Sequence, residues 1–519
     1  MATMVKSFSI SGIEGYVVDV GVKIMDGMPS MTVIGMGDKA IQEASQRVES
    51  AIDESGYVFP KKRIIVNLAP SAEKKNGSHF DVAMAVGILC HENLISVKDI
   101  SEYGLIGELS LDGTLRGCKG VLPMIITARN NHIKKVIVPS ENLREAKLVK
   151  GIEVIGLESL RDVVAYLEGK KEIIVSGSTE NIYHQDTTLD FSDVIGQDDL
   201  IDAIVLAAAG GHNMLMLGEP GCGKTMVAQR IPTILPEMTE EECLEVTKIY
   251  SIAGKLQIGN SLITTRPFRA PHHNISLNAL IGGGANAMPG EVSLAHNGVL
   301  FLDEMAEYSK HTLDALRQPV EDKKVTVSRV NGTHSFPSSF MFVTAMNPCP
   351  CGYFPSNKCK CSDYEIIKYR NKISGPIMDR IDIQKYVKPV NYFEENSGIR
   401  RRTSKELRDI VERARKIQHK RYEDAEGINC NAQMNTEQLQ RYCALNEESR
   451  QILKQASEKY GYSARAIHKL LRLARTSADI NGTDNIEIAD IQKVISLREM
   501  DRSNSELLVV TGAKVNKNG

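Results

Sequence analysis

The chain of 519 residues contains no tryptophan, and only 5% of its residues are aromatic. Stacking of nucleic-acid bases on aromatic side chains is therefore not expected to be its main mode of binding. The formal net charge is −2, so no basic field covers the whole protein. Any surface that binds DNA has to be local.

Long apolar runs are also missing. No stretch of about 18 consecutive apolar residues occurs, so the sequence predicts no membrane span. Residues 1–20 lack the apolar core and the cleavage site of a signal peptide. Six of the ten cysteines are scattered along the chain, as in proteins of a reducing cytosol. We therefore expect a cytoplasmic protein without a membrane partner.

The length exceeds what one hydrophobic core fills, and the residue patterns predict several domains. Residues 1–172 alternate strand and helix patterns, residues 173–190 form a polar linker, and residues 191–394 alternate again. Residues 395–505 show almost only helical periodicity, and residues 506–519 form a tail. The sequence thus predicts a multidomain α/β protein with a helical C-terminal domain.

The segment GEPGCGKT fits the phosphate-binding pattern G-x-x-x-x-G-K-[ST]. A strand-like run precedes it and a helix-like run follows, which is the context that this loop requires. Its backbone N–H groups should surround the phosphates of ATP, with Lys224 on their oxygens and the Thr225 hydroxyl on Mg²⁺. The predicted nucleotide-binding residues are Gly218, Glu219, Pro220, Gly221, Cys222, Gly223, Lys224, Thr225 and Asp303.

A carboxylate at the end of a second strand is needed to hold the Mg²⁺. The run GVLFLDE supplies Asp303 for the metal and Glu304 to orient or deprotonate the attacking water. A third apolar run, FMFVTAMNP, ends in Asn347, a candidate contact of the γ-phosphate and the water. The alternative for Asn347 is a turn residue ahead of Pro348.

These three motifs, with the intervening segment that contains PHH and GEVSLAHNG, resemble the helix-2-insert clade of AAA+ ATPases. Over nearly the whole chain the layout is similar to the YifB/ComM-type magnesium-chelatase-like family. The resemblance implies a P-loop αβα core, a C-terminal helical lid and an N-terminal α+β domain like that of Lon protease. It also implies a homo-oligomeric ring, usually a hexamer, with ATP between neighbouring subunits.

The resemblance assigns roles to two arginines. In SGPIMDRIDI it makes Arg380 the residue that reaches the nucleotide of a neighbouring subunit. In YGYSARAIHKLL it makes Arg465 a contact of the γ-phosphate. An arginine suits both roles because its planar fork donates two hydrogen bonds and stays charged. For Arg380 an ion pair with Asp379 or Asp382 remains the alternative.

The N-terminal segment KKNGSHFDVAMAVGIL resembles the Lon protease domain. The Lon pattern would place its serine nucleophile at His79 and its lysine near Leu122. Neither position carries the required residue, so we expect a Lon-like fold without peptidase activity. A shifted pair of Ser78 and Lys119 is the alternative.

The segment EDKKVTVSRVNGTHSFPSSF predicts a β-hairpin, with Asn331-Gly332 in its turn. In the helix-2-insert clade this hairpin projects into the central channel of the ring. The resemblance therefore makes three residues candidate contacts of DNA phosphates. They are Lys323, Lys324 and Arg329. A solvated edge hairpin that its charges protect from aggregation is the alternative.

Four cysteines lie close together in NPCPCGYFPSNKCKC: Cys349, Cys351, Cys359 and Cys361. Four thiolates at this density favour a structural Zn²⁺ site. The C-x-C spacing is less usual than C-x₂-C, and a loop of reduced or redox-labile cysteines is the alternative.

The main interpretation is an ATP-hydrolysing ring motor that acts on single-stranded or branched DNA. By resemblance, its work would be that of a helicase or of branch migration in recombination or natural transformation. One alternative is a chelatase-type ATPase that remodels a partner metal-insertion protein, although those subunits lack the N-terminal segment. Another is a protein unfoldase or regulator, for which an aromatic and apolar pore loop would be expected.

Overall fold

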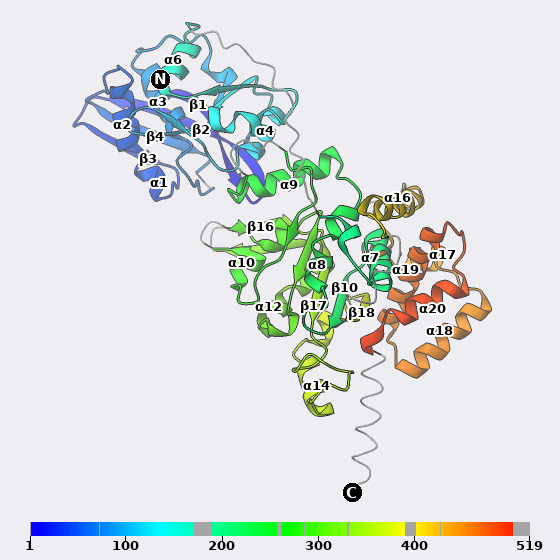
Figure 1. The fold of residues 1–519 in the computed structure, drawn as a ribbon. Coiled ribbons are helices and arrows are strands. Elements are labelled where there is room, and N and C mark those ends of the chain that lie inside the picture. The colour runs from blue at the N-terminus through cyan, green and yellow to red at the C-terminus, as the bar shows by residue number, and fades with distance from the viewer. Residues whose placement is uncertain are drawn as a thin grey trace.

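The protein is described by a computed structural model. The described residues are 2–71, 73–170, 189–256, 262–284, 287–329, 332–389, 401–425 and 427–501. The predicted tail 506–519, nearly all of the predicted linker 173–190 and Asn331 of the predicted hairpin turn lie outside them. The fold is mixed α/β, with a parallel sheet and a helical C-terminal region (Figure 1).

The N-terminal part is built on a seven-stranded mixed sheet in the order β3-β4-β2-β1-β5-β8-β9. Its strands are β1 (Thr3–Ser11), β2 (Glu14–Met25), β3 (Ser30–Ile34), β4 (Arg63–Ala69), β5 (Tyr103–Leu105), β8 (Lys135–Pro139) and β9 (Glu153–Leu157). Alternation along β2 sends Val18 and Val20 to one face and Val17 to the other. The sheet therefore has an apolar layer on both faces.

Helices cover both faces of this sheet. Residues of α2 (Ala44–Glu54), α3 (Asp81–His91) and α6 (Leu160–Leu167) share the core of one face. Residues of α4 (Val121–Asn130) share the core of the other face with Phe8 of β1. The short strands β6 (Glu108–Leu109) and β7 (Leu115–Arg116) pair beside them.

The second sheet is parallel, with five strands in the order β11-β14-β17-β10-β18. The strands are β10 (Met214–Gly218), β11 (Phe268–Arg269), β14 (Val299–Leu302), β17 (Met341–Met346) and β18 (Ile383–Val387). Strands that are buried on both faces need continuous apolar runs, and MLML, VLFL and MFVTAM supply them. The three apolar runs that precede the polar motifs in the sequence are thus adjacent strands.

Each face of the parallel sheet has its own core. Met214 and Met216 pack with α7 (Asp198–Gly210) and with the C-terminal helices, whereas Leu215 and Leu217 pack toward α12 (Lys310–Ala315) and α13 (Arg317–Asp322). The C-terminal helices are α16 (Ser404–Arg421), α17 (Thr436–Tyr442), α18 (Glu447–Tyr460), α19 (Ala464–Asn481) and α20 (Ile488–Ser496). They lie together on one side of the sheet (Figure 1).

The predicted hairpin is confirmed. Strand β15 (Lys324–Arg329) pairs antiparallel with β16 (Gly332–Pro337). Val325 and Val327 of β15 are buried, which fixes the face that the hairpin turns to the core. It is inserted between β14 and β17, two strands of the parallel sheet.

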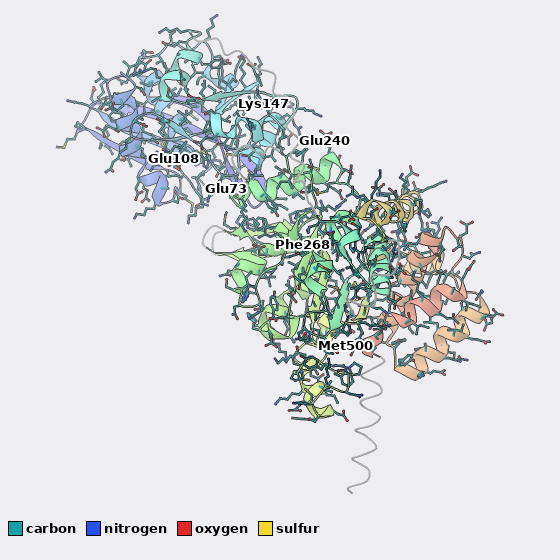
Figure 2. All side chains as sticks on the ribbon, in the orientation of Figure 1. Glu73, Glu108, Lys147, Glu240, Phe268 and Met500 are labelled. Atoms are coloured by element: carbon teal, nitrogen blue, oxygen red, sulfur yellow. The ribbon has the colours of Figure 1, made fainter. Side chains whose placement is uncertain are left out.

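Helix α9 (Glu240–Ile252) lies between the two sheets, as Figures 1 and 2 show, with Glu240 labelled at its start. The backbone N–H of Gly120 donates to the carbonyl of Ser251, 3.1 Å away. Ser11 of β1 lies 3.5 Å from the imidazole of His334 in β16. The N-terminal part therefore contacts both α9 and the hairpin. No helix in the described ranges combines the length and apolar character needed to cross a bilayer.

Candidate functional site

The loop between β10 and α8 (Lys224–Ala228) has a backbone that only glycine tolerates at several points. Gly221 has φ 78° and Gly223 has φ 86°, a region that side chains disfavour. A Cβ on Gly218 would lie 2.7 Å from the carbonyl oxygen of Val387. The glycines of the motif are therefore required by the local geometry.

The Lys224 side chain lies at the centre of this loop. Its ammonium donates hydrogen bonds to the carbonyl oxygens of Gly218 and Glu219, 2.7 and 3.0 Å away. It also lies 3.4 Å from the side-chain oxygen of Asn347, which follows β17. Two residues that are far apart in the sequence thus meet where the phosphates of a nucleotide would bind.

Thr225 and Asp303 form the candidate Mg²⁺ site. The Thr225 hydroxyl donates to a carboxylate oxygen of Asp303 across 2.6 Å. A hydroxyl and a carboxylate at this distance offer two oxygen ligands to a hard cation, which is the donor set that Mg²⁺ prefers. The two side chains therefore fit the metal that the motifs predict.

Glu304 follows with a backbone in the left-handed region, at φ 50°. A residue with a side chain adopts this region rarely, and such strain is concentrated at functional sites. The Glu304 N–H donates to the Asp303 carboxylate across 2.9 Å, and 60% of the Glu304 side chain is exposed. The turn thereby points one carboxylate at the metal site and leaves the next carboxylate open to water.

His273 has no role in the motifs of the sequence, yet the structure places it at the site. Its Nδ1 lies 3.6 Å from a carboxylate oxygen of Glu304. Its ring packs edge-on against Tyr308, whose hydroxyl donates to the carbonyl of Pro271. His273 lies within the segment between β11 and β14, and the paired histidines of PHH were the available signal.

Arg380 and Arg465 do not lie beside Lys224. Both line a cleft of about 1150 Å³, together with Asn213, Gly298 and other residues at the starts of the parallel strands. The phosphate loop and the Asp303 and Asn347 motifs instead follow the ends of those strands. A five-residue strand spans roughly 17 Å. The arginines therefore lie at the edge of the sheet formed by the amino ends of the strands, and the phosphate loop lies at the opposite edge, formed by their carboxyl ends.

Arg380 has partners within its own chain. Its Nε donates to the carbonyl of Arg317 and one Nη to the carbonyl of Pro376, at 3.0 and 2.6 Å. The other Nη pairs with Glu321. The alternative partners Asp379 and Asp382 are thus replaced by a glutamate at the end of α13.

Asp382 is instead held by the start of β10 and by α19. Its carboxylate accepts from the Asn213 N–H at 3.0 Å and lies 3.5 Å from the Lys469 ammonium. Burial alone would raise the pKa of this carboxyl, but the charge of Lys469 and the hydrogen bonds from His212 and the Asn213 N–H hold the pKa well below its usual range. Asp382 is therefore ionised and anchors the segment that carries Arg380.

The three candidate DNA contacts are separated. Lys323 ends α13 with φ 56°, and its ammonium lies 6.0 Å from the centre of the Phe340 ring in the same cleft as Arg380. Burial lowers the pKa of Lys323. Lys324 is exposed at the base of the hairpin, whereas the side chain of Arg329 lies outside the described residues. The structure thus places Lys323 in the cleft rather than on the projecting hairpin.

The four clustered cysteines converge. All four sulfur atoms lie within 4.8 Å of one another, and the Cys349–Cys351, Cys351–Cys359 and Cys349–Cys359 separations are 3.4, 3.6 and 3.8 Å. A tetrahedral Zn²⁺ site with bonds of about 2.3 Å has sulfur–sulfur edges of about 3.8 Å, whereas a disulfide is about 2 Å long. N–H groups of Tyr353 and Lys360 lower the pKa of Cys351 to about 6, whereas desolvation raises the pKa of Cys359 and of Cys361. The geometry fits a four-thiolate metal site.

Comparison with known proteins shows the family. The family described as Magnesium chelatase, subunit ChlI matches residues 190–395, and its C-terminal counterpart matches residues 401–498. The family described as Subunit ChlI of Mg-chelatase matches residues 20–142. Competence protein ComM of Haemophilus influenzae is 38% identical over 506 residues, which cover 96% of this chain and 98% of that protein. The chain belongs to the ComM/YifB family of magnesium-chelatase-like AAA+ proteins.

Other relatives agree with this assignment. The uncharacterized protein YifB of Escherichia coli is 37% identical over 492 residues, which cover 95% of this chain and 96% of YifB. Lon protease of Chlamydia muridarum is 26% identical over 166 residues, or 30% of this chain and 20% of that protease. The resemblance that the motifs indicated is confirmed at the level of the family.

In this ComM/YifB-family chain the Lon-like positions carry other contacts. His79 is buried with Nε2 2.8 Å from the carbonyl of Phe8, and burial lowers the pKa of His79 to about 4. Ser78 donates to the Glu108 carboxylate. Lys119 packs against Gly254, since a Cβ added to Gly254 would lie 2.6 Å from the Cε of Lys119. Within the part of the chain that the structure describes, no hydrogen bond joins Ser78 to Lys119, and the Ser78 hydroxyl is bonded to Glu108.

Proposed function

We propose that this chain is an ATP hydrolase that assembles into a ring, usually a hexamer in the family, and acts on DNA. One observation carries the proposal. Lys224, Asp303 and their neighbours form half of a nucleotide site at one edge of the parallel sheet, and Arg380 and Arg465 lie at the opposite edge. Copies arranged head to tail complete each site from two chains, and such contacts form a ring when the rotation between neighbouring copies closes.

The residues have separate tasks in the assembled site. Lys224 and the loop N–H groups bind the phosphates, and Thr225 and Asp303 hold Mg²⁺, which supplies positive charge to the phosphate oxygens. Glu304 orients and deprotonates the attacking water, and Asn347 contacts that water and the γ-phosphate. Arg380 and Arg465 of the neighbouring copy stabilise the negative charge that develops on the γ-phosphate.

The substrate in this proposal is single-stranded or branched DNA. The description of one relative as a competence protein supports work on DNA in natural transformation, as a helicase or in branch migration. The exposed Lys324 and the adjoining hairpin are candidate contacts of the phosphate backbone. A cytoplasmic location follows from the same proposal.

Two further parts of the proposal concern the remaining sites. The four cysteines would hold a structural Zn²⁺ ion, because soft thiolates select this cation and a closed set of four leaves no open position for catalysis. The N-terminal part would lack peptidase activity. A fluorogenic peptide assay tests this, and cleavage that depends on Ser78 would contradict it.

The rate of ATP hydrolysis with and without forked DNA tests the proposal. The variant with Lys324→Ala and Arg329→Ala should keep the DNA-free rate, lose most of the stimulation by DNA and show a smaller dependence of binding on salt. Lys454→Ala, an exposed lysine on α18, is the matched control. DNA stimulation that is equal in all three proteins would exclude the hairpin, and the absence of salt-sensitive DNA binding would exclude DNA.

A further inference from the structure

The four-cysteine loop touches the phosphate loop at one point. Gly352, directly after Cys351, has φ 85°, and a Cβ built on it would lie 2.8 Å from Cδ and 3.0 Å from Cγ of Pro220. Pro220 belongs to the phosphate-binding motif. The backbone of one loop therefore lies against the ring of the other at a distance that leaves no room for a side chain.

The same loop also continues directly from Asn347. Cys349 is buried two residues after Asn347, and its sulfur accepts a hydrogen bond from the Phe354 N–H. Arg370 of α14 (Asp363–Arg370) donates to the carbonyl of Pro348 across 3.2 Å. The loop thus borders the ATP site on two sides, through Pro220 and through Asn347.

The apolar core of this loop is small. It consists of Cys349 and Ile366, with partly buried neighbours that include Phe354 and the other three cysteines. A core of this size cannot hold a loop in one conformation, and small structural units of this kind depend on a metal or on disulfides. Because all ten cysteines of the chain are free, a metal is the cross-link that the geometry allows.

We propose that Zn²⁺ in the four-cysteine loop clamps the ATP site, because the bound metal fixes Gly352 against Pro220 and fixes Asn347 near Lys224. This inference rests on the proposed ATP site and adds a task for the metal. Asn347 and Lys224 are 3.4 Å apart, so a small shift of either loop removes their contact. A displacement of about 1 Å at such a site is enough to cost a factor of about 100 in activity.

Gly352→Ala tests the contact while all four thiols remain. The new methyl group would push Pro220 away, so the variant should retain one Zn²⁺ per chain and bind a fluorescent ADP analogue about tenfold more weakly. Gly56→Ala is the matched control, since Gly56 has φ 91° and a Cβ added there would meet nothing within 4 Å. It should match the wild type in both zinc content and ADP affinity.

The double variant Cys359→Ser/Cys361→Ser tests the metal itself. It should lose Zn²⁺, as measured by elemental mass spectrometry, and lose ADP affinity to a similar extent. Cys90→Ser, in the N-terminal part, should lose neither. If the double variant does not fold, the ADP affinity of wild-type protein stripped of Zn²⁺ by a chelator decides.

Two outcomes would overturn the clamp: wild-type protein that binds ADP without any Zn²⁺, or variants at both positions that bind ADP as the wild type does. Wild-type protein that holds Zn²⁺ but binds no nucleotide would instead overturn the proposed ATPase function. The zinc measurement therefore separates the two failures.

Discussion

The ammonium of Lys469 donates a hydrogen bond to the carbonyl of Ile381, 3.1 Å away, and it also bonds the carbonyl of Asp379. These two carbonyls flank Arg380. Lys469 lies one helical turn after Arg465 on α19. The helix that carries Arg465 is therefore hydrogen-bonded to the segment that carries Arg380. The cleft therefore presents two arginines as one preformed surface.

Replacing Lys469 should separate binding from catalysis. Lys469→Met removes the grip on the Arg380 segment and leaves Asp382 without its cation, while the phosphate loop at the far edge is unchanged. We expect kcat for ATP hydrolysis to fall about tenfold or more, with the affinity for ADP unchanged, and Lys469→Arg to restore part of the rate. Lys454→Met on α18 is the control. Loss of ADP affinity with an unchanged kcat would contradict the assigned role.

Replacing the carboxylate that faces water should stop hydrolysis without preventing binding. Glu304→Gln keeps the size of the side chain and removes the base, so ATP should still bind while the rate falls by a factor of about 100 or more. Lys224→Ala should abolish binding itself, since its ammonium is the cation at the centre of the loop. Equilibrium binding and steady-state phosphate release distinguish the two variants.

His273 should act on hydrolysis through Glu304. His273→Ala removes the group that lies 3.6 Å from the Glu304 carboxylate, so the carboxylate loses its position relative to the water. We expect a lower kcat, an unchanged ADP affinity and no further loss when His273→Ala is combined with Glu304→Gln. His311→Ala, an exposed histidine on α12, is the control. Additive losses in the double variant would show that the two residues act independently.

Local patterns were sufficient to predict that the three motifs meet around Lys224. The apolar runs before Gly218, Asp303 and Asn347 became neighbouring parallel strands, because buried parallel strands place their carboxyl ends at one edge. The alternation of Val325 and Val327 likewise predicted the hairpin. In each case the signal is contained within a few consecutive residues.

Features that depend on packing between distant segments were not predicted. The edge of the sheet on which Arg380 and Arg465 lie is decided by how the C-terminal helices pack, and no local pattern contains that information. Lys323 was grouped with the hairpin, yet its left-handed backbone at the end of α13 turns it into the cleft. No sequence motif indicated a role for His273, because its proximity to Glu304 depends on the fold.

The buried His79 should make the N-terminal part sensitive to acid. Burial lowers the pKa of His79 to about 4, while the unfolded chain takes up this proton near pH 6.5, at about the ordinary value. The unfolded state therefore binds more protons between these values, and the free energy of unfolding decreases as the pH falls from about 6.5 to 4, by about 3 kcal/mol in total.

His79→Gln keeps a donor for the Phe8 carbonyl and cannot be charged. Calorimetric unfolding at pH 7 and pH 5 should show a smaller acid-induced decrease in Tm for this variant than for the wild type. His132→Gln, at an exposed position, should behave as the wild type does. Equal pH dependence in all three proteins would show that His79 does not titrate on unfolding.

The most direct test of the shared nucleotide site mixes two inactive proteins. Lys224→Ala lacks a working phosphate loop but keeps both arginines, whereas Arg380→Ala/Arg465→Ala keeps the loop and lacks the arginines. In rings formed from an equal mixture, about one quarter of the interfaces would join an intact loop to intact arginines. We predict that mixing restores ATP hydrolysis to about that fraction of the wild-type rate. A mixture that stays as inactive as its components, although mixed rings form, would contradict a nucleotide site shared between two chains.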